Sequence, residues 1–158
     1  MSIDECFRKG MLKRIKPDKN EINNSLDLSR HFLSRAAGSM KQKYFDVAFL
    51  MAYNSMFQSC RALLFSAGVK ERSHYCMIEF VKKEFADDEK ISSLAKALDS
   101  YRLARHAIQY DGEACDESDA KSIIGDAKEF LDNAVKSLKV HENNSNEKNT
   151  NNRKAKTK

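Results

Sequence analysis

Residues 45–67 form a segment that would be apolar on almost every side of a helix, and this constrains the fold more than any other stretch. A helix of this kind is buried among other elements or lies in a membrane. The longest uncharged run within it, residues 47–60, contains Asn54 and Gln58 and is shorter than the roughly 20 residues that span a bilayer. We therefore predict the central helix of a helical bundle and no membrane partner.

The chain of 158 residues has only 5 Gly and 1 Pro, so it has few positions for the tight turns of a sandwich or barrel. Apolar residues recur at helical spacing on both sides of the central segment, and no segment has the period of a strand. Gly68 is placed to end the central helix, and Ser73 to cap the next one. The other helices are expected at residues 20–40, from Ser73 to about Phe85, 91–110 and 116–140. The predicted fold is all-α, an antiparallel bundle of four to five helices.

Three parts of the chain differ in composition. Residues 1–18 form a short amphipathic lead, residues 19–140 the helical domain, and residues 141–158 an Asn/Lys-rich tail that we expect to be disordered. The tail has five basic and two acidic residues, so it carries +3 of the net charge of +5. The charge of the remaining body is therefore weak support for nucleic-acid binding.

The chain shows no pattern for a metal, a cofactor or a secretory leader. The four cysteines, at positions 6, 60, 76 and 115, include no Cys-x-x-Cys pair, and we expect them to be reduced and structural. His31, His74, His106 and His141 join no ligand set with zinc spacing. His74 opens a helix, where we expect a neutral, hydrogen-bonded, structural imidazole. The start of the chain lacks a signal peptide, so we expect a cytoplasmic protein.

The helix at 91–110 changes character along one face. Ile91, Leu94, Ala95 and Leu98 define an inward arc, and the same arc then meets polar side chains. These are Arg102, Arg105 and Gln109, with Tyr101 and His106 at the margins. A second polar line on the central helix consists of Asn54, Gln58 and Arg61. The two lines are expected to face one groove or one symmetric interface, although arginine side chains can also extend into solvent.

The order of motifs resembles the HEPN domain in its compact prokaryotic branch. The residues that carry the resemblance are Ala52-Tyr53-Asn54-Ser55-Met56-Phe57-Gln58-Ser59-Cys60-Arg61-Ala62-Leu63-Leu64, followed by Gly68, Ser73-His74 and Arg105-x4-Tyr110. The likeness covers about residues 1–140. It implies an antiparallel helical bundle that dimerises, often beside a minimal nucleotidyltransferase partner.

The resemblance also implies a possible activity, because many HEPN domains are metal-independent endoribonucleases that act as toxins or in phage defence. Their motif is an Arg followed, after four to six residues, by a His. The Arg steadies a phosphate and the imidazole transfers protons. This chain departs from the motif: Tyr110 occupies the slot after Arg105, and His106 follows Arg105 directly.

Three functions remain open from the sequence. The first is a HEPN-type binding protein with a nucleotide- or RNA-facing groove, in a toxin–antitoxin or nucleotidyltransferase module, without enzymatic activity. That groove would be lined by Arg102, Arg105, Gln109, Tyr110, Asn54, Gln58 and Arg61. The second is a metal-independent endoribonuclease that uses Arg105 with His106 or Tyr110. The third is a structural module in which the polar face is a subunit contact.

Overall fold

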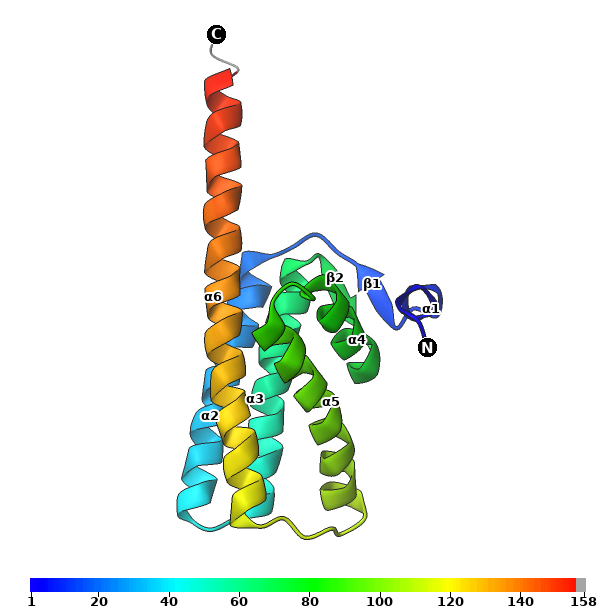
Figure 1. Cartoon of the computed structure of the whole chain (residues 1–158), viewed down its shortest axis with the longest axis vertical. Helices are drawn as coiled ribbons and strands as arrows, with labels where there is room; N and C mark the ends of the chain where they lie inside the picture. The colour runs from blue at the N-terminus through cyan, green and yellow to red at the C-terminus, as the bar shows by residue number, and fades with distance from the viewer. Residues whose placement is uncertain (156–158) are drawn as a thin grey trace.

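The computed structural model describes the backbone of residues 1–155. It describes the side chains of residues 1–139 and of Lys148, Thr150, Arg153 and Ala155. Within this range the chain is a helical bundle with one small two-stranded sheet, which confirms the predicted all-α class (Figure 1). The elements are α1 (Ile3–Arg8), β1 (Leu12–Arg14), α2 (Lys19–Lys41), α3 (Phe45–Ser66), β2 (Val69–Glu71), α4 (His74–Glu84), α5 (Glu89–Tyr110) and α6 (Glu117–Ala155).

Helix α3 is the centre of the bundle, as its all-round apolar character predicts. It contacts α2, α4, α5 and α6. Its largest fully buried side chains are Tyr53, Met56, Leu63 and Leu64. In Figure 1, α2 and α6 run alongside α3, while α4 and α5 lie on its other side. No helix of the described part is long and apolar enough to cross a membrane.

Three buried serines join α2 to α3. The Ser29 hydroxyl donates a hydrogen bond to the Ser55 carbonyl oxygen at 2.9 Å. Its Oγ lies 3.0 Å from Ser55 Oγ and 2.8 Å from Ser59 Oγ. All three side chains are almost fully buried, so each needs such a partner in the absence of water.

The predicted boundaries of α3 and α4 are confirmed. Gly68 follows α3 with φ +70°, a conformation that glycine adopts at little cost. Its N–H donates to the Phe65 carbonyl at 3.0 Å, and its own carbonyl accepts from Ile15 N at 2.9 Å. The Ser73 side chain caps α4 by accepting a hydrogen bond from Cys76 N at 3.3 Å.

The N-terminal lead contains a strand that sequence patterning does not reveal. After α1, β1 pairs antiparallel with β2 in the register Leu12↔Glu71, Lys13↔Lys70 and Arg14↔Val69. Three residues are too few to display the alternation of a strand. The expectation that no strand is present is therefore corrected.

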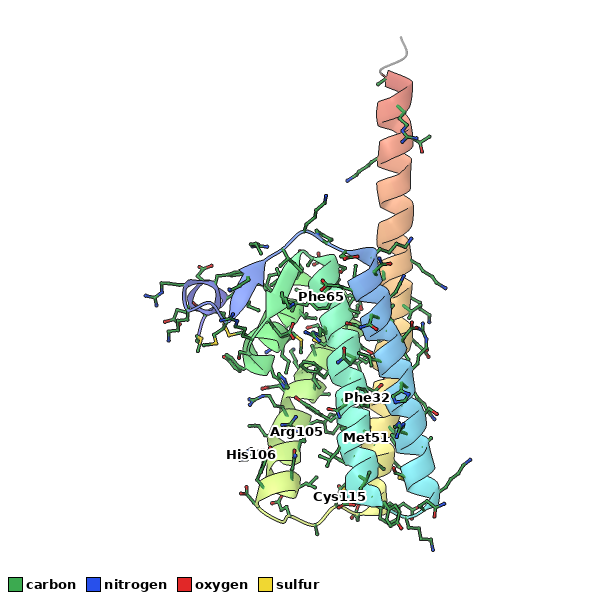
Figure 2. All side chains as sticks on the ribbon, turned by 180° about the vertical axis from the view of Figure 1, so that it is seen from behind. Phe32, Met51, Phe65, Arg105, His106 and Cys115 are labelled. Carbon is green, nitrogen blue, oxygen red and sulfur yellow. A yellow bond between two sulfur atoms is a disulfide. The ribbon has the colours of Figure 1, made fainter. Side chains whose placement is uncertain are left out.

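The expectation of four reduced cysteines is wrong in this structure. Cys6 of α1 and Cys76 of α4 form a disulfide with a Cα–Cα distance of 5.9 Å (Figure 2). The two residues are separated by 70 positions, and only the folded arrangement of α1 against α4 brings them together. Cys60 and Cys115 are free.

The C-terminal tail also differs from its expected disorder, because α6 continues to Ala155. Its core-facing positions end with Ala134, and the described side chains beyond residue 140 are exposed. The physical reason is that residues 126–155 contain neither Gly nor Pro, and an existing helix extends without a new nucleation step. Residues 156–158 of the predicted tail lie outside the described part.

Candidate functional site

The face of α5 changes from apolar to cationic at mid-helix, as predicted. Ile91, Leu94, Ala95 and Leu98 are buried against the bundle. Arg102 and Arg105 continue the same face and are only partly buried. Helix geometry thus holds two guanidinium groups at the edge of the core.

Arg105 packs against the central helix. Its Cζ lies 4.9 Å from the centre of the Tyr53 ring, in a cation–π contact. Its Nε is buried and has no hydrogen-bond partner, and no carboxylate of the described residues lies within ion-pair distance of it. Arg105 therefore has an uncompensated charge and an unused donor.

Arg102 is one turn earlier and is better compensated. Its Nε lies 2.9 Å from Asp99 Oδ1, in an ion pair on the same helix. Its guanidinium lies 6.0 Å from the centre of the Tyr75 ring of α4. Arg102 thus extends the cationic face of α5 towards the start of α4.

His74, the first residue of α4, faces these arginines. Its Nδ1 lies 3.1 Å from the Tyr53 hydroxyl, and its ring centre lies 4.3 Å from that of Phe57. Burial lowers the pKa of His74, and the charges of Arg105, Arg102 and Arg61 lower that pKa further. The imidazole is therefore neutral at pH 7, which agrees with the predicted neutral, hydrogen-bonded state.

Arg61 of α3, whose charge also lowers the pKa of His74, forms an ion pair of its own. Its Nε lies 2.9 Å from Oε1 of Glu71, whose side chain is only 7% exposed. Burial raises the pKa of Glu71, and the Arg61 charge opposes that rise. Glu71 belongs to β2, so the small sheet fixes the position of the acid that accompanies Arg61.

Tyr53 of α3 lies between Arg105 and His74 and contacts both. It is fully buried. Burial raises the pKa of Tyr53 to about 12, although Arg105 and Arg102 lower it, so the hydroxyl keeps its proton at neutral pH. We call His74 and the three arginines whose charges act on it, Arg61, Arg102 and Arg105, the arginine–histidine cluster.

The remaining predicted site residues have different surroundings. Gln58 of α3 is 9% exposed and its Oε1 has no hydrogen-bond partner, while Asn54 is partly buried. Gln109 is exposed. The three arginines of the cluster are thus among the residues that the sequence suggests. Gln109, which the sequence also suggests, makes no recorded contact with them.

His106 and Tyr110 are exposed on α5 and contact each other. Their ring centres are 4.9 Å apart, and Tyr110 is 63% exposed. In Figure 2, His106 lies on the side of α5 away from α3, whereas Arg105 packs on Tyr53 of α3. The arrangement therefore pairs Arg105 with His74, and not with His106 or Tyr110.

His74, Tyr53 and Glu71 are not among the site residues that the sequence predicts. The sequence does contain a signal for His74, because Ser73-His74 is one of the motifs shared with HEPN domains. Its nearness to Arg105 depends on how α4 packs beside α3 and α5, which no spacing rule provides. No group of three or more metal-ligating side chains occurs in the described part of the chain.

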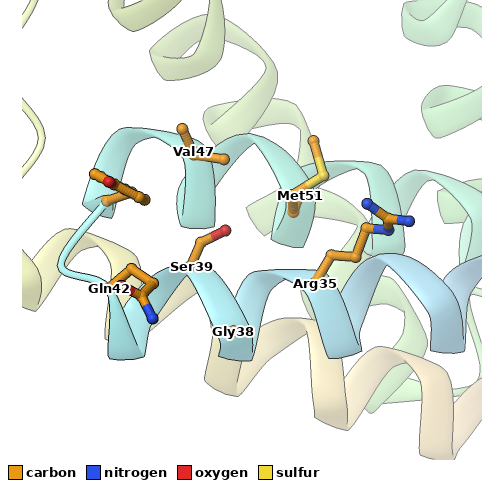
Figure 3. A pocket seen from close by; sticks show the side chains of 7 residues that line it. Arg35, Gly38, Ser39, Gln42, Val47 and Met51 are labelled. Carbon is orange, nitrogen blue, oxygen red and sulfur yellow. The ribbon is translucent and has the colours of Figure 1, made fainter.

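A second surface feature lies at the corner between α2 and α3. It is a pocket of about 270 Å³ lined by Arg35, Gly38, Ser39, Gln42, Tyr44, Val47 and Met51 (Figure 3). Tyr44 is 59% exposed and Val47 is 40% exposed. The pocket is at the opposite end of α3 from Arg61 and shares no residue with the arginine–histidine cluster.

Comparison with known proteins agrees with this architecture. One relative is "Putative toxin MJ0605" of Methanocaldococcus jannaschii, which is 28% identical over 126 residues, covering 78% of this chain and 93% of the relative. The sequence model of the HEPN domain family matches residues 23–138, which include all of α3, α4 and α5 and therefore the whole cluster. The chain belongs to the HEPN domain family.

Proposed function

We propose that this HEPN protein is the toxin-like component of a two-protein module and that its arginine–histidine cluster binds a phosphate group of RNA or a nucleotide. The observation that carries the proposal is that Arg105 and His74 contact the same side chain, Tyr53: the Arg105 guanidinium lies 4.9 Å from its ring centre, and His74 Nδ1 lies 3.1 Å from its hydroxyl. Arg105 lacks both an acidic partner and a hydrogen-bond partner for Nε among the described residues. A cationic cluster with an unused donor suits an anion.

The chemistry of the side chains fits a phosphate. A guanidinium group can donate two parallel hydrogen bonds to phosphate oxygens, and such charge-assisted bonds are about twice as strong as neutral ones. Partial burial of Arg102 and Arg105 reduces screening by solvent. Neutral His74 can add a hydrogen bond without adding charge.

The relative's name supports the toxin-like role, and a toxin requires a partner that restrains it. We propose an antitoxin-type partner, with the nucleotidyltransferase implied by the family resemblance as the candidate. A homodimer and a cytoplasmic location belong to the same proposal. The open pocket beside Tyr44 and Val47 offers partly apolar surface for a protein contact.

Phosphate binding can be tested with Arg105→Ala. Loss of a charge-assisted contact worth about 1.5–3 kcal/mol lowers the affinity for a short single-stranded RNA or for inorganic phosphate by tenfold or more. Isothermal titration at two salt concentrations measures this loss and the expected weaker salt dependence. Lys96→Ala is the control, because it removes an exposed charge from the same helix. Equal affinities of the two variants would contradict the proposal.

Cleavage of RNA is a second candidate function, favoured by one observation. His74 has a lowered pKa and shares Tyr53 with Arg105, so a neutral imidazole is available beside a phosphate-binding cation to accept a proton. The sequence instead suggests His106 or Tyr110 as the partner of Arg105, but these two rings contact each other and not Tyr53.

The two functions can be separated with chelator-treated protein. If the chain cleaves RNA, His74→Gln removes cleavage and retains binding, whereas His106→Gln keeps both. Absence of cleavage by the unsubstituted chain leaves binding as the function. Cleavage that persists in His74→Gln rules out the role of His74.

A further inference from the structure

Residues 1–14, which we call the N-terminal segment, precede the part of the chain that matches the HEPN family. This segment consists of the six-residue helix α1 and the three-residue strand β1. A helix this short is not stable in isolation, and neither is a two-stranded ribbon of this length. The segment therefore depends on its attachments to the bundle.

Those attachments lie mainly on α4 and β2, and they include the buried side chains of Cys6 and Leu12. Cys6 is bonded to Cys76, and the Phe7 ring packs edge-on against Phe80 at 6.2 Å. Strand β1 pairs with β2, and Arg72 N donates to the Met11 carbonyl at 2.8 Å. The disulfide is the covalent attachment of the segment, and the burial of Leu12 and the packing of Phe7 are non-covalent ones.

The attachment points are also supports of the arginine–histidine cluster. Cys76 lies two residues after His74, in the first turn of α4. Glu71, the ionic partner of Arg61, is paired with Leu12 in the sheet. Release of the N-terminal segment would thus free both the start of α4 and the strand that positions Glu71.

We propose that Cys6 and Cys76 form a reversible thiol–disulfide site, whose substrate is a low-molecular-weight disulfide and whose oxidation state controls docking of the N-terminal segment. Cys6 lies on a terminal helix of six residues, so local opening of α1 would expose both sulfur atoms, which are buried in the closed fold, to a small reagent. This inference goes beyond the proposed function and rests on separate contacts.

The exchange balances without a further reactant. One cysteine thiolate attacks a sulfur of the small disulfide, which forms a mixed disulfide and releases one small thiol. The second cysteine then attacks the protein sulfur of that mixed disulfide and displaces the second small thiol. Overall, the two cysteines lose two electrons and two protons, and the small disulfide becomes two thiols.

The other cysteines are poor competitors for this exchange. Cys60 lies within the central helix α3 and not on a terminal element like Cys6, and burial raises the pKa of its thiol. Burial and the nearby carboxylates of Asp119 and Asp116 raise the pKa of Cys115 to about 11. Because the thiolate is the reactive form, both are less nucleophilic at neutral pH than an ordinary cysteine. Cys6 and Cys76 are therefore the expected pair.

The test uses the full chain equilibrated with oxidised or reduced glutathione. Alkylation after denaturation, read by mass spectrometry, is expected to find free thiols at Cys60 and Cys115 alone after oxidation, and at all four cysteines after reduction. At short labelling times, hydrogen exchange is expected to speed up about tenfold or more on reduction for residues 1–14 and 69–72, while the amides of α3, which open only when the whole fold opens, are still unexchanged. Equal exchange of residues 1–14 in both states overturns the proposal, and so does alkylation of all four cysteines after oxidation.

Variants supply the controls. Cys6→Ser is expected to exchange rapidly at residues 1–14 in both buffers, while Cys115→Ser retains the full redox response. If Cys6→Ser does not fold, the two redox states of the unsubstituted chain still decide the question. Arg105→Ala is expected to lose phosphate binding and keep the redox response, so failure of one proposal is distinguishable from failure of the other.

Discussion

At the scale of single residues, Gly68 has two independent reasons to be glycine. Its φ is +70°, and an added Cβ would lie 3.0 Å from the Ile15 carbonyl oxygen. The neighbour is backbone, which cannot move aside as a flexible side chain could. We predict that Gly68→Ala lowers the free energy of unfolding by about 1–2 kcal/mol or more, measured by urea denaturation.

Gly125 is the matched control for that substitution. It lies within α6, and an added Cβ would meet nothing within 4 Å. Gly125→Ala is therefore expected to raise the free energy of unfolding by about 0.5–1 kcal/mol. Similar effects of the two substitutions would contradict the role assigned to the turn at Gly68.

His74 should make stability depend on pH. Its pKa is lowered in the folded chain by burial and by Arg105, so the unfolded chain binds a proton more readily. Its contribution is present above about pH 6.5, the ordinary value for histidine, and is lost as the pH falls through the lower folded pKa. We predict that His74→Gln flattens the fall in stability between pH 7.5 and pH 5, measured by denaturation at each pH. An unchanged slope would contradict this, and exposed His106→Gln is the control.

The residues of the candidate site divide by how their positions arise. Arg102 and Arg105 follow the apolar arc of one helix, so a projection of that helix predicts where they lie. The nearness of His74 and Glu71 depends on the packing of α4 and on the pairing of β2 with β1, which are not local in sequence. His106, next to Arg105 in the chain, lies on another face of the helix because adjacent residues of an α-helix are about 100° apart around its axis.

At the scale of elements, α3 provides a test of the core. Met56 is fully buried at mid-helix, while Val47 of the same helix is 40% exposed. Met56→Ala is expected to lower the free energy of unfolding by about 2–5 kcal/mol, because it removes buried apolar groups and leaves a cavity. Val47→Ala should cost much less. Thermal or urea denaturation that finds similar costs would mean that α3 is not central.

Helix α6 consists of a packed part and an extension. Side chains as far as Ala134 are buried, and Val135 and Leu138 pack partly against the core. We predict that deletion of residues 141–158 leaves the melting temperature unchanged within error but reduces helical circular dichroism per molecule. A marked fall in melting temperature would show that the extension stabilises the body.

The elements that sequence reasoning predicts are those with long repeated patterns. Helices α2, α3, α5 and the packed part of α6 each have several turns, so their apolar positions repeat often enough to be recognised. Strand β1 has three residues and α1 has six, which is too little pattern for recognition. The disulfide joins α1 to α4 across 70 positions, and no local pattern predicts so long-range a contact.

At the scale of the whole molecule, the disulfide closes a loop across 70 positions of the sequence. In the chain-entropy model, closure of a loop of this length stabilises the folded state by about 4 kcal/mol. We predict a lower melting temperature after reduction, measured by calorimetry, with Cys6→Ser unaffected by the reductant. A melting temperature that is independent of reductant would contradict the prediction.

The three hydroxyls between α2 and α3 have a mechanical consequence for the whole bundle. If α2 slid along α3 by one helical turn, Ser29 would leave Ser55 and Ser59, and buried hydroxyls would lose their partners. The two helices are thus fixed in one axial register and form a stationary frame. Movement that accompanies ligand binding is therefore expected in the elements outside this pair, such as α1, α4 and the two strands.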